Sequence, residues 1–172
     1  EVVTRTLRLI QNDLPKNVTI REALAADLAR VDGDAEQLKQ VLINLVQNAA
    51  QAIGDKPGEI VLTTLKPERF GDFRQPDSIE IQVTDSGPGI PPEQQLNIFV
   101  PFFTTKQKGT GLGLAICQRI VKSHGGTIAV QSKVGEGATF VIRLPSLPSE
   151  QPAPETPLPE GTPMPGTIAP PE

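Results

Sequence analysis

The sequence predicts an α+β fold, a two-layer sandwich in which a mixed, mostly antiparallel sheet carries three main helices on one face. Three features support this prediction. Alternating apolar residues indicate strands, apolar residues three and four apart indicate helices between them, and the last two strands are joined by a glycine-rich turn. That last arrangement is typical of a hairpin.

The helices are predicted from their apolar spacing. Residues 1–13 read as a weakly amphipathic helix that cannot continue past Pro15. Asp34 is a good N-cap for a long helix with a continuous apolar face, and Gly54 stands where a C-terminal glycine is expected. The third helix is expected to follow the glycines that end at Gly113 and to reach Ser123.

The strands are predicted from period-two alternation and from the turn residues that bound them. Residues 67–77 are polar and without period, so they are expected to form a loop. Gly135-Glu136-Gly137 is expected to be the turn of the closing hairpin. The expected strands are 17–24, 60–65, 78–84, 127–132 and 138–144.

Composition predicts one domain over residues 1–145 and a disordered tail over 146–172. The chain has 172 residues and 18 prolines, and prolines dominate the tail, where apolar residues are isolated and cannot build a core. Because the chain begins at Glu1, in what reads as the middle of a helix, it is expected to be a piece of a longer protein.

The charge pattern excludes two classes of partner. The formal net charge is −4 and no long basic run is present, so neither nucleic acid nor a membrane is expected to be a partner. No apolar run is long enough to cross a bilayer, and no signal peptide is found. The single cysteine, Cys117, excludes an internal disulfide and is expected to be a small core residue.

A glycine-rich stretch leads into the third helix and predicts an anion site. It runs from Gly109 to Gly113 with the sequence GTGLG. Glycines let main-chain N–H groups approach a ligand closely, and the first N–H groups of a helix have no partner within the helix. We expect a polyphosphate site with Lys106 and Lys108 beside it; the alternative is an ordinary loop.

Two polar groups suggest the rest of a nucleotide site. Asn44 and Asn48 lie four residues apart on one helix face, and an amide oxygen suits Mg²⁺ that phosphates already hold. Asp85 follows a strand just before Gly87 and Gly89, where a carboxylate can accept from the amino group of a base. The alternatives are surface or capping asparagines, and an aspartate that only closes a turn.

The order of these stretches resembles the N, G1, F and G2 boxes of sensor histidine kinases. The chain contains NLVQNA from Asn44, DSGPGI from Asp85, FVPFFTTK from Phe99, GTGLGLAI from Gly109 and a closing GATFVIRLP. The resemblance is to the catalytic, ATP-binding domain of two-component kinases within the GHKL superfamily, and covers roughly residues 2–145. PFFTTK and NAAQAI look most like the nitrogen-regulation and dicarboxylate-sensing kinases.

The resemblance implies a Bergerat-type ATP-binding fold and a role for each box. Asn48 would be the Mg²⁺ ligand with Asn44 nearby, Asp85 would recognise the adenine amino group, and Thr139 would support adenine through water. Phe99 to Gly109 would be the mobile ATP lid. The remaining implied ATP-binding residues are Gly87, Gly89 and Ile90 at the base, Thr104, Thr105 and Lys106 in the lid, and Thr110, Gly111, Leu112, Gly113 and Leu114 at the phosphates.

Two positions differ from related sequences and bear on the expected chemistry. Gln51 stands where many relatives have a lysine, so Lys106, and with it Lys108, is expected to supply the positive charge. Asn44 stands where superfamily ATPases and serine kinases have a glutamate that acts as general base. Without that base, transfer to a neutral histidine is favoured, because imidazole is already nucleophilic.

The function implied is therefore a protein-histidine kinase domain. It would bind ATP and Mg²⁺ and transfer the γ-phosphoryl to a histidine on a separate dimerisation domain, with a response regulator as an indirect partner and a cytoplasmic location. Asn44, Asn48 and Lys106 would be its catalytic residues, and His124 a helix C-terminal residue rather than the acceptor. The alternatives are an ATP-hydrolysing conformational switch and a nucleotide-binding interaction module.

Overall fold

The computed structural model describes residues 2–67, 77–106 and 109–147. Its elements, in chain order, are α1 (Val2–Ile10), β1 (Val18–Leu24), α2 (Ala35–Ile53), β2 (Gly58–Leu65), β3 (Ser78–Asp85), α3 (Pro92–Gln95), α4 (Gly113–Ser123), β4 (Thr127–Ser132) and β5 (Ala138–Pro145). Apart from their end residues, the predicted loop over 67–77 and most of the predicted tail, 148–172, lie outside the described residues.

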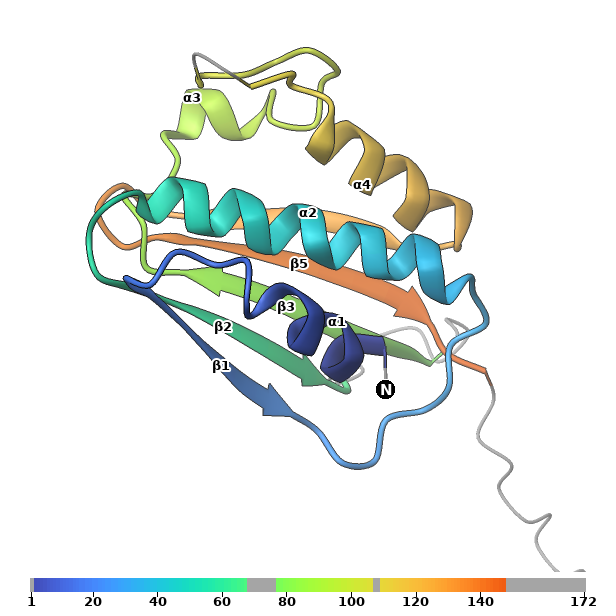
Figure 1. The fold of residues 1–172 in the computed structure, drawn as a ribbon. Coiled ribbons are helices and arrows are strands. Elements are labelled where there is room, and N and C mark those ends of the chain that lie inside the picture. The colour runs from blue at the N-terminus through green and yellow to red at the C-terminus, as the bar shows by residue number, and fades with distance from the viewer. Residues whose placement is uncertain (1, 68–76, 107–108, 148–172) are drawn as a thin grey trace, which may run out of the picture.

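The strands form one mixed sheet in the order β1-β2-β3-β5-β4. β1 and β2 are parallel because α2 crosses over between them, and the other neighbouring pairs are antiparallel. Figure 1 shows α1, α2 and α4 on the same face of this sheet, so the predicted two-layer α+β architecture is confirmed. β4 and β5 form the predicted hairpin.

The core lies between that sheet face and the apolar side of α2. Alternate residues of the central strands face the helices, among them Leu62, Val83 and Ile142, each at most 2% exposed. Leu45 and Val46 of α2 have no exposed surface. α2 is the central element of the helical layer, in contact with α1, α4, β2 and β3.

Capping fixes both ends of α2 as predicted. The Asp34 carboxylate accepts from the N–H groups of Glu36 at 2.8 Å and Gln37 at 3.2 Å. The N–H groups of Gln37 and Glu36 hold the pKa of Asp34 below its ordinary value. Gly54 ends the helix with φ 66°, where it donates its N–H to the Ala50 carbonyl at 3.1 Å.

α4 packs on α2 through a buried cysteine. The Cys117 side chain is fully buried, and its thiol lies 3.8 Å from the Val41 carbonyl of α2. Burial raises the pKa of Cys117 to about 11, although a hydrogen bond with Asn44 opposes the shift. The prediction of a core cysteine is confirmed, since a thiol in this state carries little thiolate at neutral pH.

The structure differs from the sequence prediction at element ends and in one short helix. α1 ends at Ile10, and β2 begins at Gly58, whose N–H donates to the Asn17 carbonyl at 3.0 Å. α3 was not predicted, because four residues after Pro91 are too few to show an apolar period. Within the described residues, no helix combines the length and apolar character needed to cross a membrane.

Candidate functional site

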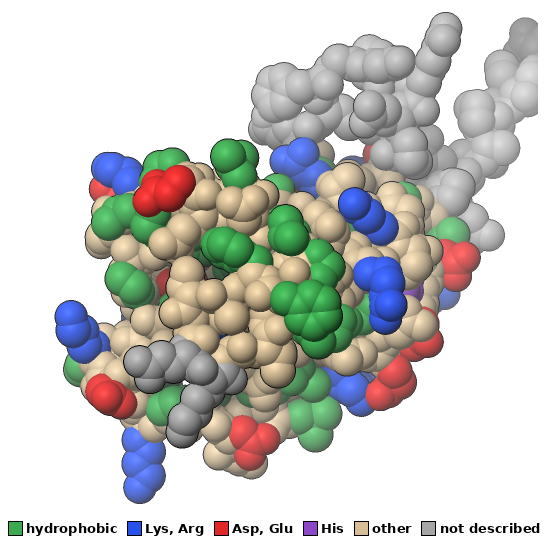
Figure 2. Space-filling model, turned by 90° about the horizontal axis from the view of Figure 1, so that it is seen from above, with side chains coloured by type: hydrophobic (Ala, Val, Ile, Leu, Met, Phe, Trp, Pro, Cys, Tyr) green, Lys and Arg blue, Asp and Glu red, His purple; other side chains and the backbone are tan. Residues whose placement is uncertain are grey.

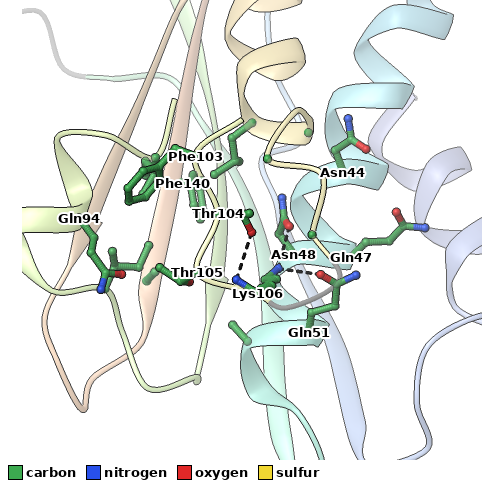
Figure 3. A pocket seen from close by; sticks show the side chains of 18 of the residues that line it. Asn44, Gln47, Asn48, Gln51, Gln94, Phe103, Thr104, Thr105, Lys106 and Phe140 are labelled. Carbon is green, nitrogen blue, oxygen red and sulfur yellow. Dashed lines mark hydrogen bonds between the residues drawn. The ribbon is translucent and has the colours of Figure 1, made fainter. Parts of the chain in front are cut away.

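One cavity of about 700 Å³ collects most of the residues singled out in the sequence. It is bounded by α2, the ends of β3 and β5, the segment after β3 and the start of α4. Asn44, Gln47, Asn48 and Gln51 of α2 line it, and Figure 3 shows Asn48 and Gln51 turned toward Lys106, on the side opposite Phe103 and Phe140. The pocket is therefore lined by amides on one side and apolar rings on another.

Asp85 ends β3 inside this pocket. The side chain is buried, at 4% exposure, and its Oδ1 accepts from the Gly87 N–H at 2.8 Å. Burial raises the pKa of Asp85, while hydrogen bonds from the N–H groups of Gly87 and Ala138 oppose that shift. A buried carboxylate with a free lone pair is suited to accept from a donor on a flat, apolar ligand.

The segment after β3 is fastened to the end of β4. The Ile90 N–H donates to Ser132 Oγ at 2.8 Å, and Gln95 Nε2 donates to the Ile90 carbonyl at 2.7 Å. Gly89 has φ 75°, and a Cβ there would lie 2.2 Å from the Lys133 carbonyl oxygen. Only glycine fits this approach, so the loop beside Asp85 has a fixed path.

Lys106 reaches across the pocket to α2. Its Nζ donates to Asn48 Oδ1 at 3.1 Å and to Gln51 Oε1 at 2.6 Å, contacts drawn in Figure 3. Partial burial lowers the pKa of Lys106. Among the described residues that line the cavity, Lys106 is the only lysine or arginine, so the positive charge there comes from this side chain.

The glycine-rich stretch brings the start of α4 to the pocket. Gly111 has φ 66°, and a Cβ there would lie 2.4 Å from the Phe102 carbonyl carbon. Phe102, whose own φ is 67°, donates its N–H to the Gly111 carbonyl at 2.9 Å. α4 then begins at Gly113 without a side-chain cap, so its first N–H groups remain open to an anion.

Most of the predicted site residues do line the cavity. Lys108 lies outside the described residues. Gly87 and Leu112 are neighbours of the lining rather than part of it: Gly87 holds Asp85, and Leu112 is the N-cap of α4. The predicted residues found in the lining are Asn44, Asn48, Asp85, Gly89, Ile90, Thr104, Thr105, Lys106, Gly109, Thr110, Gly111, Gly113 and Leu114.

Two predicted residues, Thr139 and Phe99, are not part of the cavity lining. Thr139 is paired with Thr84, and their hydroxyl oxygens lie 3.0 Å apart on the sheet face opposite the helices. The strand alternation that turns Asp85 toward the pocket turns Thr84 and Thr139 away from it. Phe99 does not line the cavity either; its ring packs edge-on against Phe140, with centroids 6.4 Å apart, which makes it a packing residue.

Several lining residues were missed by the sequence analysis. Ala138 and Phe140 alternate with Thr139 on β5, and their strand partners are Asp85 and Val83. Gln51 lies three residues after Asn48, on the same helix face, and was noted only as a departure from related sequences. The missed residues are Gln47, Gln51, Ala52, Pro88, Gln94, Ile98, Phe103, Ala138 and Phe140.

The amide oxygens of α2 are the candidate ligands for a divalent metal in this cavity. No group of three or more His, Cys, Asp or Glu within the described ranges could hold a metal ion. Asn48 Oδ1 already accepts from a cationic group, the Lys106 ammonium. A hard oxygen facing positive charge fits a Mg²⁺ that brings phosphate and water as its other ligands.

Comparison with curated proteins finds sensor kinases. The chain is 42% identical over 152 residues to the sensor histidine kinase ZraS of Salmonella typhi, covering 88% of this chain and 31% of ZraS. It is 39% identical over 152 residues to the sensory histidine kinase/phosphatase NtrB of Rhizobium leguminosarum bv. phaseoli, covering 84% of this chain and 39% of NtrB. The chain thus spans about a third of these relatives.

Solved structures agree with this finding. The catalytic domain of the histidine kinase ThkA matches with a TM-score of 0.70 at 36% identity, covering 84% of this chain and 90% of that domain. ThkA in complex with the response regulator TrrA matches with a TM-score of 0.64 at 33% identity, covering 87% of this chain and 41% of ThkA. Residues 33–148 match the family model described as histidine kinase-, DNA gyrase B- and HSP90-like ATPase, and the chain belongs to this family.

Proposed function

We propose that the chain is the ATP-binding catalytic domain of a sensor histidine kinase. It binds Mg·ATP in the cavity and delivers the γ-phosphoryl to a histidine on a separate dimerisation domain, from which a response regulator receives it. The observation that carries the proposal is the convergence on one cavity of Asp85, Asn48 and the uncapped start of α4.

The adenine end of the proposed site is built around Asp85. Its buried carboxylate accepts from the amino group of the base, and Ile90 and Phe140 offer apolar surface to the ring. Guanine presents a carbonyl where adenine has its amino group, and two acceptors facing each other repel. Asp85 therefore selects adenine.

The phosphate end lies between α2 and the start of α4. The first N–H groups of α4 and the Lys106 ammonium bind the phosphate oxygens, and Asn48, with Asn44 beside it, holds the metal. Bound Mg²⁺ would neutralise phosphate charge. The protein's own contribution is to place the γ-phosphoryl and stabilise the charge spread over its oxygens, because phosphoryl transfer needs little covalent help.

The scarcity of carboxylates among the described lining residues favours histidine over water as the acceptor of the phosphoryl group. Asp85 is the only Asp or Glu among the described lining residues, and it is assigned to the base. Activation of water needs a general base within hydrogen-bond reach. A neutral imidazole needs no such base, so the cavity is better equipped for transfer to a histidine.

An exposed apolar surface beside the cavity supports docking of the histidine-bearing domain. Figure 2 looks onto the face that carries α3 and α4, where charged side chains lie mostly toward the edges. The segment between these helices exposes Leu96 at 85%, Val100 at 49% and Phe102 at 75%. Exposed apolar side chains grouped in this way mark an interaction surface.

The test supplies the missing acceptor. The chain is mixed with Mg·ATP and a separately prepared dimerisation domain containing the target histidine, and phosphate on that domain is measured with its stability to acid and base. We expect an acid-labile, base-stable phosphate that is absent when the target histidine is replaced by glutamine. The Asn48→Ala chain should give at least about a hundredfold less product, because positioning and charge neutralisation supply the rate.

Two other results would overturn the proposal. Sustained phosphate release without any acceptor, and no labelled histidine, would indicate an ATP-hydrolysing switch. Tight Mg·ATP binding with neither transfer nor hydrolysis would indicate a nucleotide-binding interaction module.

A further inference from the structure

We propose that Gln51 is a positioning residue that holds the Lys106 ammonium at the phosphate end of the cavity. The inference rests on the proposed function and names a residue that this function does not itself require. The contact joins residues 55 positions apart, one on α2 and one in the segment before the glycine-rich stretch.

The side-chain geometry separates Gln51 from Asn48 as partners of Lys106. The distance from Nζ to Gln51 Oε1 is 2.6 Å, against 3.1 Å to Asn48 Oδ1. A charge-assisted hydrogen bond of the shorter length is the stronger of the two. Gln51 is therefore the main anchor of the ammonium group.

A bound metal would weaken the contact of Lys106 with Asn48 and leave its contact with Gln51. When Asn48 Oδ1 serves a divalent cation, the same oxygen cannot also hold an ammonium group closely, because like charges repel. Gln51, one turn further along α2 and on the same face, remains available as an acceptor. Gln51 therefore keeps the Lys106 ammonium group in the cavity while Asn48 Oδ1 binds the metal.

The backbone of Lys106 is fixed independently of its side chain. Its N–H donates to Thr104 Oγ1 at 3.1 Å, and its carbonyl accepts from the Gly109 N–H at 3.1 Å. A Cβ at Gly109 would lie 2.4 Å from Thr104 Oγ1, so Gly109 lies close against Thr104. With the backbone held, the acceptor on Gln51 decides where the long side chain points.

The experiment measures binding to the whole chain by calorimetry, with two probes. One is the Mg²⁺ complex of a non-hydrolysable ATP analogue, and the other is adenosine, which has no phosphates. We expect Lys106→Gln to weaken the analogue about tenfold and Gln51→Leu about fivefold, with adenosine unchanged in both. The double variant should bind the analogue no more weakly than Lys106→Gln alone, because Gln51 acts through Lys106.

A charge exchange tests position rather than packing. The variant with Gln51→Lys and Lys106→Gln returns an ammonium group to the same contact from the opposite side. We expect it to recover at least half of the binding free energy lost in Lys106→Gln. Gln40→Leu, an exposed glutamine outside the cavity on the same helix, is the matched control and should bind like the unaltered chain.

The outcomes separate this inference from the proposed function. If Asp85→Asn and Asn48→Ala leave analogue binding unchanged, the proposed function fails. If those variants weaken binding but Gln51→Leu matches Gln40→Leu, or its effect adds fully to that of Lys106→Gln, the role of Gln51 is refuted. Equal losses for adenosine and the analogue would also refute it, because Gln51 would then be shaping the whole cavity.

Discussion

A single buried carboxylate sets the electrostatics of the end of the cavity that we propose binds the base. Asp85 is 4% exposed and accepts hydrogen bonds from two backbone N–H groups. Lys106 is the only cationic side chain among the described lining residues, and it contacts α2 instead. Burial raises the pKa of this carboxyl, so its ionised form is costly and sensitive to pH. A ligand that donates to the carboxylate regains part of that cost.

This raised pKa predicts a pH dependence of adenine binding. As pH falls through the raised value, the carboxyl takes up a proton and loses acceptor capacity, so affinity for adenosine should decline at a higher pH than an ordinary aspartate would give. Adenosine is the probe because it has no phosphates, so no phosphate titration overlaps with that of the carboxyl. Affinity measured by calorimetry or amide chemical shifts between neutral and mildly acidic pH checks the expectation.

The control for this titration is Asp85→Asn. The amide oxygen can still accept from the Gly87 N–H, so the variant should fold with unchanged or slightly higher stability at neutral pH, where the desolvated charge is gone. It should bind adenosine at least about tenfold more weakly and without the acid decline. An unchanged pH profile in the variant would assign the titration to another group.

At the scale of elements, α2 and α4 are joined at the ends away from the cavity. His124 caps α4; its Nδ1 lies 2.8 Å from the Ile120 carbonyl, and its Nε2 accepts from the Asp34 N–H at 3.0 Å. This pattern assigns the ring proton to Nδ1. The predicted position of His124 at the C-terminus of the helix is confirmed, and the bond to the N-cap of α2 adds a tertiary contact that helix periodicity does not reveal.

We expect His124→Ala to lower the free energy of unfolding by about 1–2 kcal/mol, since two hydrogen bonds and the packing against Gly33 are lost. Urea unfolding followed by circular dichroism measures the change. Arg119→Ala, an exposed position on the same helix, should fall within about 0.5 kcal/mol of the unaltered chain. If the two variants are equally stable, the histidine bridge contributes nothing to helix placement.

Sequence patterns predicted the structural features that depend on one segment of the chain. They did not predict the features that depend on how two segments pack against each other. The cap at Asp34, the apolar face of α2 and the alternation of β3 are local, and all were confirmed. The face on which Thr139 lies depends on the register of β5 against β3, which no single strand contains. The contact between Gln51 and Lys106 depends on loop closure over 55 positions, so the sequence showed the candidates and not their pairing.

At the scale of the whole molecule, the sheet separates two different environments. Its helical face holds the core, while its other face carries polar pairs such as Glu80 with Arg143 at 2.7 Å. Burial by itself would raise the pKa of Glu80, but hydrogen bonds from Gln82 and Arg143 outweigh it, so the pKa is lowered. The lowered pKa of Glu80 stabilises the folded state at pH values above the pKa that this carboxyl has in the unfolded chain. That stabilisation is lost as pH falls through the pKa of Glu80 in the folded state.

Backbone contacts beyond β5 carry the folded part of the chain past residue 145. Beyond β5, the Ser146 N–H donates to the Asp77 carbonyl and the Leu147 N–H to the Arg30 carbonyl, each at 2.7 Å. These bonds tie the residues after β5 to two other segments, both far away in sequence. We therefore propose that the folding unit extends to Leu147, two residues beyond the limit at 145 that composition suggests. From their proline-rich composition, we propose that residues 148–172 lie outside it.

Two truncations test this limit. A chain that ends at Leu147 should keep the unfolding free energy and the Mg·ATP affinity of the full chain. One that ends at Leu144 loses both bonds and should be less stable by about 1–3 kcal/mol. Urea unfolding of the three chains, with calorimetric titration of a non-hydrolysable ATP analogue, makes the comparison. Loss of stability on removing 148–172 alone would place part of the folding unit in the proline-rich segment, whereas equal stability of all three would show that the two bonds add nothing.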